Sequence, residues 1–169
     1  MFYLKMDIIQ KSLIFAKKEY KKNDPMHQWN HIEAVMKRAM EIANQLENID
    51  YKLLKLGIIF HDIDYNSEDN FEENYKNHVK NSAKIAEKFL KKENYPKEDI
   101  KRVKKIIYSH STPHREKFGD TNIKEGKILY DADKSIFIKD PNKYKKYYSK
   151  LYFSISKKLV LKQLNNKFK

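Results

Sequence analysis

The stretch LLKLGIIFHDIDY, residues 53–65, decides how the rest of this chain is interpreted. The residues before the histidine are mostly apolar, so they predict a central helix that is buried on nearly every side. The run ends abruptly in His61-Asp62. An imidazole nitrogen is a borderline ligand and a carboxylate oxygen is a hard one, and a divalent metal ion accepts both. The pair therefore indicates either a metal site at the end of a buried helix or a capped helix with a hydrogen-bonded histidine.

The composition limits how such a metal could be held. The chain has 169 residues, enough for one domain with a real core, and it has no cysteine. Any metal must therefore be held by His, Asp or Glu side chains, and a chain without disulfides fits a reducing cytoplasm. The start, MFYLKMDIIQKSLIF, lacks the basic segment and continuous apolar run of a targeting signal, and no run of about 18 apolar residues exists. We therefore expect a cytoplasmic protein with no membrane partner.

The formal net charge of +13 is large. Such a charge could steer an anionic substrate or bind nucleic acid. However, lysines occur in nearly every predicted helix, which favours generally solvated basic faces over a dedicated nucleic-acid surface.

Helical periodicity runs through the chain, with few glycines or prolines to interrupt it. The pattern predicts an all-α, single-domain bundle of about six to seven helices. Asp24-Pro25 and Asp140-Pro141 are helix start signals, and Asn122 with Glu125 resembles a capping box. We expect loops at 63–74 and 111–119, and helices at 3–22, 24–47, from Asp50 through the His-Asp stretch, 75–92, 96–110, 123–138 and 141–166.

Further histidines and aspartates fall where the helices face inward. His110 continues the apolar stripe of Val103 and Ile106, and Asp133 shares the face of Leu129. Asp131 lies about 200° from Leu129 and should point elsewhere. A buried aspartate on an apolar face needs a strong partner, and a cation is the obvious one. Taken singly, each histidine is more simply a core or surface residue, but the set together indicates a site: His31, His61, Asp62, His78, His110 and Asp133.

In their order along the chain, His31, His61-Asp62 and Asp133 resemble the HD-domain superfamily of metal-dependent phosphohydrolases, an all-helical fold named for its His-Asp pair. The likeness covers residues 24–138, and the matching segments are DPMHQWNHIEAV, GIIFHDIDY, HVKNSAKIAEKFL, KKIIYSH and GKILYDADK. The chain departs from the family after Lys134, where it reads SIFIKDPNKYKKYY, and this end commonly borders the substrate pocket.

The resemblance implies the ligands and the number of ions. His31, His61 and Asp133 would hold one ion, His78 and His110 a second, and Asp62 would bridge the two. Without the second ion, the two extra histidines would be left to bind phosphate. We expect one or two divalent ions, with Mn, Mg, Fe, Co, Ni and Zn as the candidates.

The implied activity is hydrolysis of a phosphate ester or anhydride, with a nucleotide as the expected substrate. Metal ions lower the pKa of bound water and neutralise phosphate oxygens, and Asp62 would be the catalytic residue that orients the attacking group. Lys134, His114, Arg115 and Lys117 are candidate phosphate contacts, although the last three could equally be ordinary charges of a solvated loop.

Two other functions stay open. Some HD-domain proteins with the same six-ligand pattern resemble di-iron oxygenases. The tyrosines and lysines of 141–166 could instead stack on and pair with RNA as a non-enzymatic binding module, or simply pack on the core. The oligomeric state is not indicated.

Overall fold

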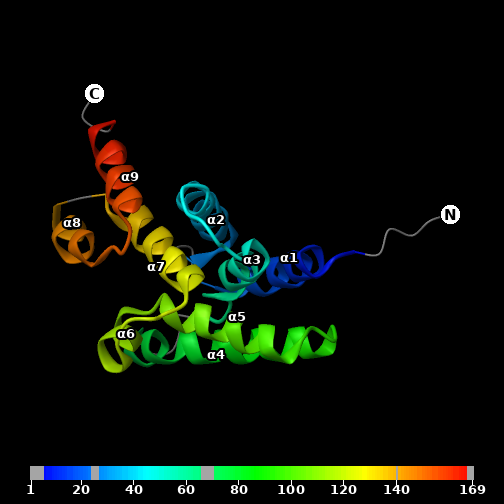
Figure 1. Cartoon of the computed structure of the whole chain (residues 1–169). Coiled ribbons are helices and arrows are strands. Elements are labelled where there is room, and N and C mark those ends of the chain that lie inside the picture. Colours follow the sequence, from blue (N-terminus) through cyan, green and yellow to red (C-terminus); the bar gives the residue numbers. More distant parts are fainter. Residues whose placement is uncertain (1–5, 24–26, 66–70, 140, 167–169) are drawn as a thin grey trace.

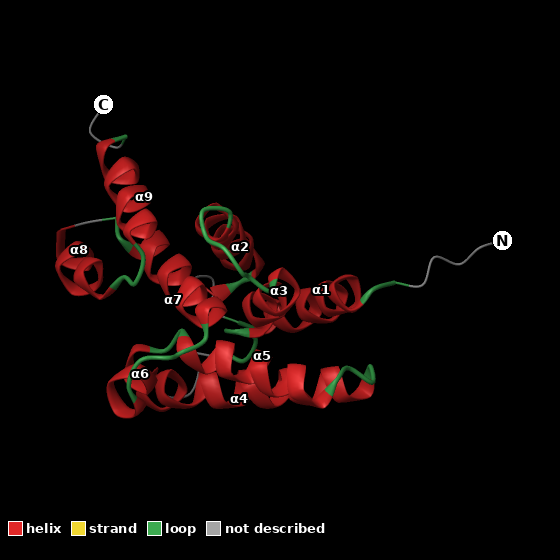
Figure 2. Ribbon diagram, in the orientation of Figure 1, coloured by secondary structure: helices red, strands yellow, loops and turns green. Residues whose placement is uncertain are grey.

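The computed structural model of the chain describes residues 6–23, 27–65, 71–139 and 141–166, and every regular element within these ranges is a helix (Figure 1; Figure 2). The prediction of an all-α protein is therefore confirmed. The α-helices, in chain order, are α1 (Ile8–Glu19), α2 (Trp29–Ala43), α3 (Tyr51–Phe60), α4 (Phe71–Lys92), α5 (Lys97–Ser109), α6 (Thr112–Phe118), α7 (Lys124–Phe137), α8 (Pro141–Tyr147) and α9 (Ser154–Asn165), with short 3-10 helices η1 (Tyr20–Lys22) and η3 (Tyr148–Lys150).

Helix α3 is the centre of the fold, as its apolar sequence predicts. The side chain of Asp50 caps it by accepting a hydrogen bond of 3.0 Å from the backbone N–H of Leu53. Every residue of α3 from Leu56 to Phe60 is buried. Gly57 lets α5 come close, because a Cβ atom at this position would lie only 2.3 Å from Cγ2 of Ile106. This tight crossing sets the separation of the two helices that end in His61 and His110.

The other helices surround α3 in pairs. Figure 1 shows α4 and α5 side by side along one edge of the molecule, and α2 packs against α7. Helix α1 packs on α3, and α5 also contacts α7. The main hydrophobic cluster draws residues from α1 to α5 and α7.

The C-terminal segment differs from the prediction of one long helix. Within the described residues it is broken into α8, η3 and α9, with an extended backbone at Leu151 (ψ 135°). The break has a tertiary cause: the buried carboxylate of Asp131 accepts hydrogen bonds from the backbone N–H groups of Tyr152 (2.8 Å) and Phe153 (2.9 Å). Leu151 is then buried with Ile138 and Val160 in a second, smaller cluster. Asp131 does point away from the Asp133 face, as predicted, and it is buried.

Four further expectations need correction or fall outside the described residues. The stretch 111–119 is mostly helix α6, started by the Ser111 side chain, which accepts from the backbone of His114 at 3.3 Å. The capping box at Asn122 is wrong, because Ile123 is the N-cap of α7 and the carboxylate of Glu125 accepts from the backbone of Asp50 instead. Residues 24–26, with the Asp24-Pro25 start signal, lie outside the description, as does Asp140. In the described ranges there are nine α-helices, so six or seven was too few.

Candidate metal centre

Four side chains from three helices meet in one buried cluster. His31 comes from the start of α2, His61 and Asp62 from the end of α3, and Asp133 from α7, and each offers one ligand atom within 4.8 Å of the others. Nε2 of His31 lies 3.3 Å from Oδ1 of Asp133, and Nε2 of His61 lies 3.3 Å from Oδ2 of Asp62. Residues about 100 positions apart in sequence thus face a common point.

A second cluster adjoins the first through Asp62. It consists of Asp62, His78 of α4 and His110 at the end of α5, all buried. Oδ1 of Asp62 lies 3.1 Å from Nε2 of His110 and 3.5 Å from Nε2 of His78. Because Oδ2 of the same carboxylate faces the first cluster, Asp62 presents one oxygen to each group.

The proton positions on two of the imidazoles follow from their hydrogen bonds. Nδ1 of His61 lies 2.8 Å from the carbonyl oxygen of Ile58, and Nδ1 of His110 lies 2.6 Å from that of Ile107. A carbonyl only accepts, so we assign the ring proton to Nδ1 in both residues. Their Nε2 lone pairs then point into the clusters. This is the arrangement that metal-binding histidines adopt, with the second nitrogen donating to a backbone carbonyl.

The buried oxygens of the clusters also favour a cation. Oδ1 of Asp62 and Oδ1 of Asp133 are buried, and among the described residues neither accepts a hydrogen bond. His110 does not satisfy Asp62, because it turns a lone pair toward the oxygen. Imidazole nitrogens likewise face one another at 3.3 Å (His31 and His61) and 3.4 Å (His78 and His110). The Nε2 lone pairs of His61 and His110 and the carboxylate oxygens repel at such distances unless a positive charge lies between them, so the residues present fit divalent ions.

The pKa shifts describe a centre of strong negative potential. Burial alone would lower the pKa of His31, but the nearby carboxylates of Asp133 and Asp62 outweigh it and raise the pKa to about 9. Burial would raise the pKa of Asp133, yet the ammonium of Lys134 and the ring of His31 hold it below its ordinary value. Burial lowers the pKa of His110, which keeps its imidazole neutral and able to bind a metal.

The clusters open into a cavity of about 240 Å³. Besides residues of the clusters, it is lined by His27, Tyr65, Ser111, Thr112, Lys134, Phe137, Lys143 and Tyr147. Nζ of Lys134 is held 2.7 Å from Oδ2 of Asp133. Burial would lower the pKa of Lys134, but Asp133 raises it, so the side chain stays an ammonium at neutral pH. On the cavity lining, the ring of His27 stacks on Tyr65 with the centroids 3.6 Å apart.

The structure separates the four predicted phosphate contacts. Lys134 lines the cavity with the clusters, whereas His114 and Arg115 line a different cavity of about 430 Å³ beside α6. Arg115 donates to Asp120 at 2.5 Å and to the carbonyl of Lys150, and Lys117 lies over the ring of Phe118. A role for these three residues in substrate binding stays a prediction.

Sequence reasoning missed the other cavity residues. His27 precedes His31 by one helical turn, and that spacing was an available signal. Nothing in the sequence indicated that Lys143 and Tyr147 line the cavity, because only the packing of α8 brings them there.

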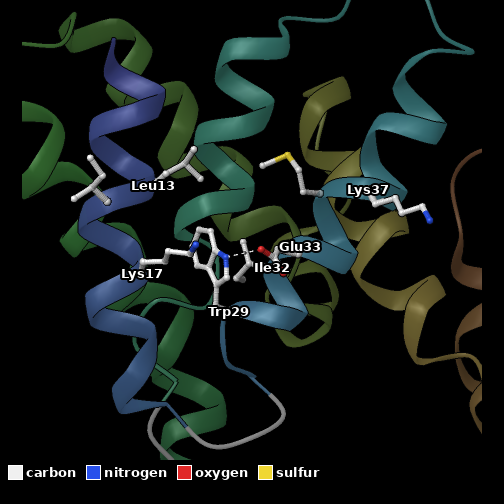
Figure 3. Close-up of a pocket in the computed structure, with 8 residues that line it drawn as sticks. Leu13, Lys17, Trp29, Ile32, Glu33 and Lys37 are labelled. Carbon is white, nitrogen blue, oxygen red and sulfur yellow. Dashed lines mark hydrogen bonds between the residues drawn. The ribbon is translucent and has the colours of Figure 1, made fainter. Parts of the chain in front are cut away.

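A larger groove elsewhere has different chemistry. It measures about 600 Å³, lies between α1 and α2, and is lined mainly by apolar side chains such as Leu13, Trp29 and Ile32 (Figure 3). Its buried wall carries no cluster of ligand atoms among the described residues, and the Trp29 indole simply donates to Glu33 at 2.8 Å. The groove is therefore not the candidate metal centre.

The fold and the paired clusters define an all-helical protein with a His/Asp centre suited to divalent metals. Residues 29–136 match the HD domain family, and the chain belongs to this family. The resemblance to the HD-domain family that the sequence indicated is therefore confirmed.

Among solved structures, the chain is similar to the crystal structure of a predicted HD superfamily hydrolase from an uncultured Thermotogales bacterium. The two share 23% identity, with 94% of this chain and 86% of that chain covered and a TM-score of 0.68. At this identity the likeness establishes a common fold. Comparison with curated proteins gave no match. None of the described helices is long and apolar enough to cross a membrane.

Proposed function

We propose that this protein is a metal-dependent phosphohydrolase that acts on a small phosphorylated substrate. The observation that carries the proposal is Asp62, whose two oxygens face two imidazole-bearing clusters at the base of a cavity that also holds the ammonium of Lys134. Metal ions held by the two clusters, with Asp62 between them and the Lys134 ammonium beside them, would suit a phosphoryl group. A cytoplasmic location and a single domain remain parts of this proposal.

The ligand sets follow from the two clusters. His31, His61, Asp133 and Oδ2 of Asp62 would hold one ion, and His78, His110 and Oδ1 of Asp62 the other. Imidazole ligands favour Fe, Ni or Zn over Mg, which prefers carboxylates and water. Bound there, such ions would lower the pKa of a bound water and neutralise the oxygens of a phosphate.

The protein's own residues provide the positioning. The carbonyls of Ile58 and Ile107 fix the rings of His61 and His110, so neither ligand has to reorient when an ion binds. Asp62 orients the attacking water, since its carboxylate lies between the two clusters. Lys134 neutralises the outer oxygen of Asp133 and brings a positive charge to the cavity wall for the phosphoryl group.

The cavity favours an anionic and small substrate. Two lysines line it, and its volume of about 240 Å³ lies below the range of about 300–1,000 Å³ typical of drug-sized ligands. These features favour a phosphomonoester or a mononucleotide. A nucleic-acid-binding module is less well supported, because Tyr144, Tyr147 and Tyr148 pack against the cluster of Ile138, Leu151 and Val160.

The experiment compares metal content and hydrolysis in matched variants. We expect protein purified without chelators to carry two transition-metal ions per chain, and to release phosphate from members of a panel of nucleotides and phosphomonoesters. Asp62→Asn should lose the second ion and nearly all turnover. Asp64→Asn, a matched change outside both clusters, should retain both.

Two results would count against the hydrolase. A protein loaded with two ions but inert toward the whole panel would contradict it. Iron together with oxygen consumption on a small polyol or phosphonate would instead establish the di-iron oxygenase, which would use the same ligands.

A further inference from the structure

One wall of the cavity is supplied by α8, which follows the part of the chain that matches the HD domain family. The family match ends at residue 136, and α8 begins at Pro141. Lys143 and Tyr147 both line the cavity. They are four residues apart, so they lie one above the other on the same face of the helix.

Helix α8 is held in place by its own packing. Tyr144 and Tyr148 stack with their ring centroids 4.4 Å apart, and these rings pack with Tyr147 against the second hydrophobic cluster. Tyr147 therefore contacts this cluster and the cavity together. The wall is part of the fold, and it places Lys143 at a defined position in the cavity lining.

The cavity thus has two ammonium groups with different surroundings. Lys134 is largely buried and is held by Asp133 beside the first cluster. Lys143 comes from a different helix and is an exposed residue of the lining. A single phosphoryl group bound at the clusters would use Lys134, which is next to a ligand. The charge of Lys143 on α8 would then lie near another part of the same substrate.

We propose that Lys143, with Tyr147 beside it, forms a second anion subsite, and that the substrate is a small phosphoester carrying another anionic group, a carboxylate or a second phosphate. This inference rests on the proposed phosphohydrolase function, because the clusters and Lys134 must hold the first phosphoryl group. The subsite makes α8 the element that selects substrates, whereas the clusters determine the reaction. The small cavity limits the spacer between the two anionic groups to a few atoms.

The test measures binding of inert phosphonates by calorimetry to the metal-loaded protein. Ethyl-, propyl- and butylphosphonate carry one anionic group. Phosphonoacetate, 3-phosphonopropionate and 4-phosphonobutyrate add a carboxylate at increasing distance. We expect at least one carboxylated probe to bind about fivefold or more tightly than its alkyl counterpart, since a charge-assisted hydrogen bond at a partly exposed site contributes at about this level. The preferred spacer reports the distance between the subsites.

Lys143→Gln should abolish this preference and leave the affinity for the alkylphosphonates within about twofold. Lys145→Gln is the matched control, because it removes the same charge from an exposed position of α8 outside the cavity lining and should retain the preference. Chelation of the metals by the probes affects all three proteins equally. Thermal unfolding of each variant verifies that it is folded.

The outcomes separate the two proposals. Equal binding of carboxylated and alkyl probes, or a preference that survives Lys143→Gln, would overturn the subsite while metal-dependent binding of alkylphosphonates still supported the hydrolase site. Loss of the preference in both variants would show a general charge effect and would also overturn it. If no phosphonate binds the metal-loaded protein, the phosphohydrolase proposal and the subsite both fail.

Discussion

The close crossing of α3 and α5 provides a direct test of how the fold positions the centre. Gly57 lies one turn before His61, and Ile106 lies one turn before His110. A Cβ added at Gly57 would be 2.3 Å from Cγ2 of Ile106, where ordinary van der Waals contact begins at 3.4 Å. Gly57 and Ile106 both lie in well-packed core helices, so either the two helices must separate or the Ile106 side chain must leave its rotamer.

The magnitude follows from two opposed effects. Replacing Gly by Ala in a helix interior stabilises by about 1 kcal/mol. Overpacking a core costs about 1–3 kcal/mol, and a contact more than 1 Å too short indicates the upper end. We therefore expect Gly57→Ala to reduce the free energy of unfolding by about 1–2 kcal/mol. Because the shift also separates His61 from His110, metal affinity should fall about tenfold.

The assay is urea unfolding of chelator-treated protein, followed by calorimetric titration with the native metal. A double-mutant cycle with Ile106→Ala isolates the clash, since that substitution removes Cγ2. In the Ile106→Ala background, Gly57→Ala should be neutral or stabilising. If Gly57→Ala alone stabilises the protein and leaves metal affinity unchanged, the reasoning about this crossing is wrong.

Three further changes test other parts of the structure. Removing the His78 imidazole with His78→Ala should reduce the metal content from two ions to one, measured by elemental analysis; two retained ions would contradict the proposed ligand set. Asp131→Ala should leave two backbone N–H groups unpaired and lower the free energy of unfolding by roughly 2 kcal/mol. Compared with the wild type, backbone hydrogen exchange should become faster throughout α9 and change less in α4. Unchanged exchange in α9 would refute the role of this residue. Hydrogen bonds from Lys104 and Lys91 lower the pKa of Glu87 to about 2. These bonds should therefore stabilise the folded protein by about 1 kcal/mol or less at pH values above the ordinary pKa of 4.5, and this stabilisation is lost as the pH falls through about 2. Wild type and Glu87→Gln should therefore differ in urea unfolding at neutral pH and converge as the pH approaches about 2; a constant difference would exclude this linkage.

Much of the centre was predictable because the relevant signals are local. The apolar run before His61 predicted the buried helix α3, and helical spacing placed His110 and Asp133 on inward faces. The family resemblance then grouped residues from five helices, and the structure brings them into two adjoining clusters. That these residues bind metal remains a prediction.

The predictions that were wrong depend on contacts between segments that are distant in sequence. The break in the C-terminal helix depends on Asp131 accepting hydrogen bonds from Tyr152 and Phe153, residues about 20 positions away. The periodicity of 141–166 fits a continuous helix and does not indicate this contact with Asp131. In the same way, the spacing of Asn122 and Glu125 fits a capping box, but Glu125 accepts from Asp50 on another helix.

The sequence by itself determined the helical class, the burial of α3 and the residues able to bind a metal, because hydrophobic periodicity and ligand chemistry are properties of the residues themselves. Only the tertiary structure decided that Asp62 turns one oxygen to each cluster, that Lys134 lines the cavity, and that α8 brings Lys143 to it. These features depend on how helices distant in sequence pack together, and local patterns do not encode the angles and distances of that packing.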